Sequence, residues 1–210
     1  MNPGTRMIKR KFMDKTNNHS YFKTVDDEYI NSLPVKTFTG TIHLIDHPSA
    51  LENLKRAIQD KPVLGFDTET RPSFKKGRYH KVALLQLSAH HDAFLFRLNK
   101  IHLPEFVMEI LENKDIIKVG VALKDDLIGL KKIMDLEPDG FVDLQKFVKQ
   151  FGIEDNGLRK LVANVLGFRL SKKSQTSNWE QDKLTREQLV YAATDAWVCQ
   201  QMYEVLNNSN

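Results

Sequence analysis

The sequence of 210 residues contains a single cysteine, Cys199, so no disulfide bond can form within the chain. It also lacks any apolar run close to the roughly 18 residues that a transmembrane helix needs. The first residues, MNPGTRMIKRKFMDK, are basic but contain no apolar stretch typical of a secretory signal peptide. These absences favour a cytoplasmic protein with no membrane partner, in which Cys199 is a small core residue.

An excess of charge of one sign is confined to the N-terminus. Residues 1–24 contain six Lys and Arg residues and one acid, whereas the rest of the chain contains 25 basic and 26 acidic residues. The formal net charge of +4 therefore does not by itself indicate a polyanionic partner for the body of the protein. Because residues 1–34 are polar and lack periodicity, they are predicted to form a basic, flexible extension before one domain, residues 35–210.

Hydrophobic periodicity predicts a chain that begins mainly with strands and continues with alternating helices and strands. Strands are expected over 37–44, 62–66, 82–87, 93–98, 115–121 and 141–143, and helices over 48–60, 104–113, 124–135, 144–151, 157–167 and 185–206. This order favours an α/β fold with a mixed sheet flanked by helices in a single domain. A ribonuclease H-like architecture fits the order, which by itself leaves other α/β folds open.

Two acidic residues, Asp67 and Glu69, directly follow the apolar run Pro62–Phe66. Because side chains alternate along a strand, both acids point to the same side at the end of a buried strand. Two neighbouring anions raise each other's pKa unless a cation lies between them, and oxygen ligands prefer hard cations such as Mg²⁺ or Mn²⁺. A solvated strand end is the ordinary alternative for an isolated pair of this kind.

The last predicted helix places Tyr191 and Asp195 four residues apart, hence on one helical face. Much of the helix is apolar, and an acid on a largely buried helix is costly unless it is paired or bound to a metal. A core tyrosine near a surface acid would be the ordinary explanation of this pair if it stood alone.

A third acidic segment contains Asp125 and Asp126 in the sequence KVGVALKDDL, residues 118–127. A strand here runs into a glycine turn, and both acids fall in the first turn of the next helix, where the helix dipole favours negative charge. Capping of that helix is therefore an alternative to metal binding for this segment.

Together, these segments resemble the DEDD superfamily of 3′-5′ exonucleases, in the subgroup whose last motif carries a tyrosine. The resemblance covers roughly residues 37–206 and is strongest to exonuclease domains of the Werner type. The matching motifs are FDTET at 66–70, VGVALKDDL at 119–127 and YAATDA at 191–196, with supporting blocks KVALLQLS at 81–88 and SNWEQDKLTREQLVYAATDA at 177–196.

The resemblance implies a role for each matching residue. Two divalent cations, Mg²⁺ or Mn²⁺, would be held by the four acids of the motifs, which are Asp67, Glu69, Asp126 and Asp195. Asp126 matches the family acid better than Asp125 because it directly precedes the apolar residue of the new helix. Tyr191 would position the attacking water, since a free tyrosine has a pKa of about 10 and is a poor general base at neutral pH.

The implied partner is the 3′ end of a nucleic acid, with DNA favoured by the Werner-type resemblance. An exoribonuclease of the same fold remains open, as does a non-catalytic nucleic-acid-binding module, although a pure binder has no need of clustered acids that repel phosphate. Two basic segments are candidates for phosphate contacts, with solvated surface loops as the alternative. Their residues are Arg71, Lys75, Lys76, Arg78 and Lys81 in the first and Lys172 and Lys173 in the second.

The aromatic residue Trp179 precedes the last helix in a polar segment. Stacking on a terminal base is one interpretation of such a tryptophan. Anchoring of the segment to the core is the favoured one.

Overall fold

The computed structural model describes residues 21–48, 54–58, 60–73, 79–171 and 176–208. A mixed sheet of six strands lies at its centre, in the order β1-β4-β3-β2-β5-β6. The strands are β1 Thr41–Ile45, β2 Val63–Thr70, β3 Val82–Ala89, β4 Asp92–Arg97, β5 Ile117–Gly120 and β6 Phe141–Asp143. The helices are α1 Asp27–Ser32, α2 Leu54–Ile58, α3 Glu105–Glu112, α4 Lys124–Lys131, α5 Leu144–Phe147, the 3-10 helix η2 Val148–Phe151, α6 Leu158–Leu166 and α7 Arg186–Asn207.

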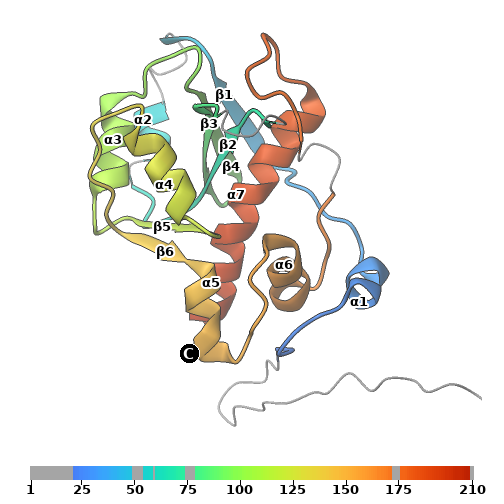
Figure 1. Ribbon diagram of the computed structural model, residues 1–210. Helices are drawn as coiled ribbons and strands as arrows, with labels where there is room; N and C mark the ends of the chain where they lie inside the picture. The colour runs from blue at the N-terminus through green and yellow to red at the C-terminus, as the bar shows by residue number, and fades with distance from the viewer. Residues whose placement is uncertain (1–20, 49–53, 59, 74–78, 172–175, 209–210) are drawn as a thin grey trace, which may run out of the picture.

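The strands β4, β3 and β2 are antiparallel to one another, whereas β1 joins β4, β5 joins β2 and β6 joins β5 in parallel. Helices α2, α3 and α4 cover one face of the sheet, and the long helix α7 crosses the other (Figure 1). This arrangement confirms the mixed sheet flanked by helices in a single domain. No helix in the described part of the chain is long and apolar enough to span a membrane.

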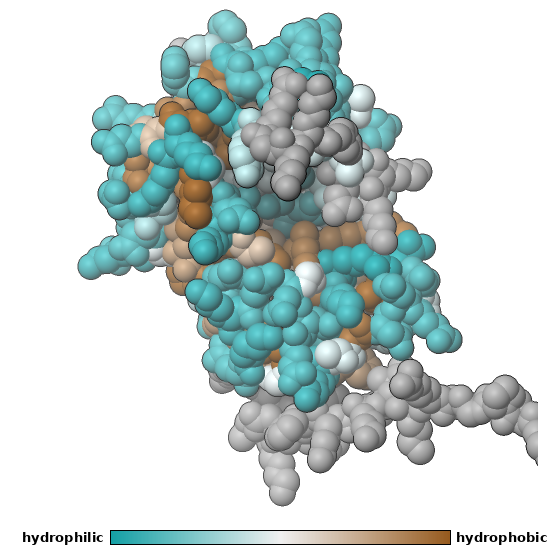
Figure 2. All heavy atoms as spheres, viewed as in Figure 1, coloured by the Kyte–Doolittle hydropathy of each residue, from teal (hydrophilic) through white to brown (hydrophobic). Residues whose placement is uncertain are grey.

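Two apolar clusters hold these layers together. One joins β2 and β3 to α2 and α3, and the other joins α6 and α7 to the β5 side of the sheet and includes the buried Cys199. Burial of apolar area is the main stabilising contribution in such a fold. Hydrophilic residues cover most of the face in Figure 2, which is hollowed between α4 and α7.

The predicted first strand begins later than the sequence pattern indicates, at Thr41 instead of 37. A side chain at Gly40 would collide with the carbonyl of His91, which accepts a hydrogen bond from the Thr41 backbone. The preceding segment leaves the sheet, and the Phe38 backbone N–H donates to the Thr194 hydroxyl of α7. The alternation of polar and apolar residues therefore extends to residues before Thr41 that lie outside the strand.

The prediction of a flexible extension up to residue 34 is wrong for residues 21–34. Helix α1 lies in this segment, and Ile30 is fully buried against Ala163 of α6. The Asn164 side chain binds both the backbone N–H and the carbonyl of Phe22. The few apolar residues here are enough to dock the segment although it lacks sustained periodicity. Residues 1–20 lie outside the described residues.

Candidate active site

Strand β2 carries Asp67 and Glu69 at the end of its apolar run, on the face that α7 covers. Gly65 allows helix and strand to approach closely, because a Cβ atom at this position would lie 1.8 Å from the carbonyl oxygen of Ala196. Since Gly65, Asp67 and Glu69 alternate with Leu64, Phe66 and Thr68, both acids face the same helix as Gly65. The sequence prediction of a shared side is confirmed.

Helix α7 brings the other half of the site. Its first turn is fixed by a capping box in which the Thr185 side chain and Gln188 each accept from the other's backbone N–H. Asp195 of this helix is 5% exposed and shares a hydrogen bond with Tyr191. The spacing of four residues therefore places both groups on the face that meets β2.

Asp67, Glu69 and Asp195 form a carboxylate cluster, in which one oxygen from each residue lies within 4.8 Å of the others. Burial raises the pKa of Asp67 well above its usual value, and the charges of Asp195, Asp126 and Glu69 raise it further. Burial also raises the pKa of Glu69 to about 9 and that of Asp195 to about 7. These acids are too crowded to ionise together without a positive charge between them.

Asp126 lies in the first turn of α4, beside the cluster but outside the group of three. Its Oδ1 accepts a hydrogen bond from the Thr68 hydroxyl, and its charge contributes to the raised pKa values of Asp67 and Glu69. Burial raises its own pKa to about 6, although the Thr68 hydrogen bond lowers it. Asp125 next to it is exposed, as the choice of Asp126 from the sequence requires.

A sharp turn brings α4 to this edge of the sheet. Ala122 adopts a φ of 60°, in the left-handed region, and its N–H donates to Asp143 at the end of β6. Gly120 passes close to the Phe66 carbonyl, where a Cβ atom would lie 2.9 Å from the oxygen. The acidic turn of α4 is therefore fixed against the end of β2.

The Tyr191 hydroxyl lies within this anionic environment. Burial, the charges of Asp195 and Glu69 and the hydrogen bond to Asp195 all raise its pKa far above the usual value. The hydroxyl therefore remains protonated and can donate a hydrogen bond. Its protonation agrees with orientation of a water molecule rather than removal of a proton.

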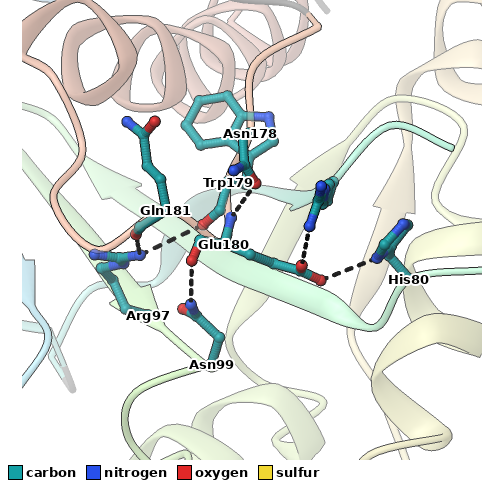
Figure 3. Close-up of polar contacts among 8 residues, drawn as sticks. His80, Arg97, Asn99, Asn178, Trp179, Glu180 and Gln181 are labelled. Atoms are coloured by element: carbon teal, nitrogen blue, oxygen red, sulfur yellow. Dashed lines mark hydrogen bonds and ion pairs between the residues drawn. The ribbon is translucent and has the colours of Figure 1, made fainter.

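Two residues of the first basic segment lie in the described part of the chain. Arg71 and Lys81 are both exposed, at the end of β2 and the start of β3. The Arg71 guanidinium lies 3.3 Å from Glu180. Glu180 also binds the His80 ring at 3.2 Å (Figure 3). Lys75, Lys76, Arg78, Lys172 and Lys173 lie outside the described residues.

Side chains at the end of β4 and just after it anchor the segment before α7 to the sheet. The buried guanidinium of Arg97 donates to the backbone carbonyl of Gln181, and Asn99 donates to that of Glu180 (Figure 3). The same guanidinium donates to the backbone carbonyl of Asp182. Trp179 is 0% exposed and packs with Ala192 and Leu95. The interpretation of Trp179 as a core anchor is confirmed, and stacking on a base is excluded by its burial.

Sequence reasoning missed three residues that belong to this site or support it. Thr68 and Glu180 have no sequence signal, because their partners are 58 and 109 residues away. Gln86 does have a sequence signal, because it is the single polar residue in the apolar run from Val82 to Leu87.

A ribonuclease H-like sheet with a carboxylate cluster at the end of a central strand defines a class of nucleases that bind metal ions. The family model described as 3′-5′ exonuclease matches residues 42–209. The chain therefore belongs to the 3′-5′ exonuclease domain family, within the DEDD superfamily.

Similar proteins support this assignment. The mouse bifunctional 3′-5′ exonuclease/ATP-dependent helicase WRN is 33% identical over 188 residues, which cover 85% of this chain and 13% of that protein. The Nibbler EXO domain of Aedes aegypti has a TM-score of 0.73 at 24% identity, covering 83% of this chain and 92% of that one. Escherichia coli RNase D, an exoribonuclease involved in structured RNA processing, has a TM-score of 0.69 at 23% identity, covering 80% and 46% of the two chains.

Proposed function

We propose that this protein is a 3′-5′ exonuclease that hydrolyses the terminal phosphodiester bonds of DNA with two divalent cations. The observation that carries the proposal is the cluster of Asp67, Glu69 and Asp195, which come from two elements and converge within 4.8 Å in a chain of the exonuclease family. Without a cation such a cluster only destabilises the fold, because it crowds three acids against the sheet.

The donor set suits Mg²⁺ or Mn²⁺. All candidate ligands are carboxylate oxygens, which hard cations prefer, and soft ligands are absent from the cluster described here. Asp67, Glu69 and Asp195 would hold one cation, and Asp67 with Asp126 the second. When bound, the cations would activate the attacking water and stabilise the charge that develops on the phosphate and the leaving oxygen.

The remaining groups of the site bind and orient. The Tyr191 hydroxyl, which donates its proton to Asp195, can accept a hydrogen bond from the attacking water and so orient it toward the scissile phosphate. Arg71 and Lys81 lie at the same edge of the sheet as Glu69, where they can contact phosphates of the strand that enters the site. The positive charge of Lys75, Lys76, Arg78, Lys172 and Lys173 is proposed to extend this contact.

DNA is the proposed substrate because the Werner-type resemblance covers every motif of the site. The likeness to E. coli RNase D supports a second candidate, an exoribonuclease with the same residues. The two activities differ in recognition of the 2′-hydroxyl group, to which none of the motifs is tied.

One assay separates these functions from a module that only binds. Labelled DNA and RNA strands of the same sequence are incubated with the protein and Mg²⁺, Mn²⁺ or EDTA, and the products are separated by length. We expect stepwise shortening of DNA from the 3′ end that EDTA abolishes. Shortening of RNA alone would show that RNA and not DNA is the substrate. Binding without shortening of either strand would refute the exonuclease activity.

The variant Asp195→Asn supplies the control for the assay. Its side chain has the same size, so the fold is retained, but it loses the charge that the cations need. Cleavage should fall by at least about 10³-fold, in line with the loss of a metal ion's catalytic contribution. Near wild-type turnover by the purified variant would show that the nuclease activity comes from another site or a contaminant.

A further inference from the structure

Gln86 in β3 is a buried polar residue with no hydrogen-bond partner. Its side chain is 0% exposed, and neither its amide nitrogen nor its amide oxygen bonds to any described residue. Ser88, the next polar residue on the strand, is also buried, but its hydroxyl donates to the carbonyl of Asp92. Buried polar groups are nearly always paired, so the amide of Gln86 requires an explanation.

The strand register places Gln86 directly beside the metal cluster. Gln86 pairs with Asp67 across the antiparallel strands β2 and β3. Directly opposed residues point to the same face, with their Cβ atoms about 5 Å apart. The side chain of Gln86 therefore lies on the α7 face, next to the carboxylate with the most crowded surroundings in the site.

The apolar surroundings of Gln86 do not account for an amide. Leu84 lies two residues before Gln86 in β3, and Leu95 lies opposite Gln86 in β4. Both pack in one apolar cluster with Ala192 of α7. A methionine or leucine side chain would fill the same space without an unpaired donor and acceptor, and would be the more stable choice. The amide group at this position is thus expected to have a role other than packing.

The Asp67 carboxylate is the group to which the Gln86 amide can donate a hydrogen bond. The hydrogen bond recorded to Asp67 comes from the Thr68 backbone, and carboxylates that bind metal ions commonly accept a further hydrogen bond that fixes their orientation. We propose that Gln86 is a positioning residue whose amide N–H donates to the Asp67 carboxylate when cations are bound. This role rests on the proposed function, because it concerns the acid that both cations would share.

The variant Gln86→Met tests the role, since it keeps the length of the side chain and removes its hydrogen-bonding groups. Ser88→Ala is the matched control, on the same strand and the same face but opposite Gly65 instead of an acid. Three quantities are compared: the melting temperature in EDTA, the affinity for Mn²⁺ in the absence of nucleic acid, and kcat and KM for DNA.

For Gln86→Met we expect a melting temperature in EDTA equal to or above that of the wild type. Mn²⁺ affinity and kcat should each fall roughly 10-fold to 100-fold, the range found for outer partners of metal ligands. KM for DNA should change much less, because the amide does not contact the strand. Ser88→Ala should match the wild type in Mn²⁺ affinity and kcat.

Unchanged Mn²⁺ affinity in Gln86→Met would overturn the proposal, whatever happens to its stability. A second variant, Gln86→Leu, guards against a local packing fault, and failure of both variants to fold would also overturn it, because the residue would then be structural. If the wild type shortens no strand at all, the proposed function fails, yet the Mn²⁺ titration still decides the role of Gln86.

Discussion

The hydroxyl group of Thr68 in β2 donates a hydrogen bond to Oδ1 of Asp126 in α4, across 58 residues of sequence. Thr68 points to the face of the sheet opposite to Asp67 and Glu69, where α4 lies. Strand β2 therefore organises the acids on both faces: it carries two of them itself and holds the third through a hydroxyl group.

We expect the variant Thr68→Val to weaken the second cation site. Valine has the shape of threonine but cannot donate, so Asp126 loses the hydrogen bond that lowers its pKa and fixes its orientation. The Mg²⁺ concentration for half-maximal cleavage should rise about 10-fold. Thr68→Ser, which keeps the donor, should remain close to the wild type, and equal behaviour of the Val and Ser variants would show that the hydroxyl has no such role.

The stability of the metal-free protein should fall as the pH rises. The pKa values of Asp126, Asp195 and Glu69 are raised to about 6, 7 and 9, so the folded protein keeps protons that the unfolded chain releases above pH of about 4. Because the unfolded state binds fewer protons than the folded state, the free energy of unfolding decreases as the pH rises from about 4 to about 9.

Thermal unfolding in EDTA between about pH 5 and about pH 9 measures this decline. Saturating Mg²⁺ should abolish most of it, because the cations stabilise the ionised acids of the folded state. The variant Asp195→Asn should show a shallower decline in EDTA, since one of the crowded acids is gone. A melting temperature that rises with pH in EDTA would contradict the electrostatics of the cluster.

Replacing Tyr191 with phenylalanine should lower kcat by about 10²-fold and leave KM nearly unchanged, because the hydroxyl orients the water and does not bind the strand. The raised pKa of Tyr191 keeps its proton in place at neutral and moderately alkaline pH. The pH profiles of kcat for the wild type and Tyr191→Phe should therefore run parallel up to about pH 10. A limb that rises with pH only in the wild type would identify the tyrosinate as a base.

The elements and the acids of the site could be predicted because their signals are local. The acidic pair of β2 follows from alternation along one strand, and Tyr191 with Asp195 follows from the helical repeat. The register of the sheet was beyond such reasoning, since nothing near Asp67 indicates that Gln86 lies opposite to it. Local patterns indicate on which face of an element a side chain lies, but not which strand pairs with that element.

The features that were not predicted have the same origin. The segment containing Ile30 was predicted to be flexible because its neighbours are polar, yet one buried isoleucine and the paired backbone of Phe22 fix it to α6. The contact of Arg71, a proposed phosphate ligand, with Glu180 could not be foreseen either, because Glu180 lies in a segment 109 residues away. Contacts between distant segments decide both cases, and composition carries no information about them.

The basic segment after β2 should control binding of the strand more than chemistry. Charge reversal of Lys75, Lys76 and Arg78 removes the positive charge that is proposed to contact phosphates and leaves the carboxylate residues unchanged. We expect KM for DNA to rise more than about 10-fold while kcat changes little, and the dependence of log KM on log salt to become shallower by about 2, since each phosphate contact on a single strand contributes about 0.7.

The matched control reverses Lys61 and Lys114, which precede β2 and β5 and so lie at the opposite ends of the strands from Glu69. Reversal of these two charges changes the net charge by 4 units, against 6 for the three charges reversed in the 75–78 variant, but should keep the wild-type KM and salt dependence, because the effect is local to the path of the strand. An equal rise of KM in both variants would assign the effect to net charge alone. An unchanged KM in the 75–78 variant would remove this segment from the proposed binding surface.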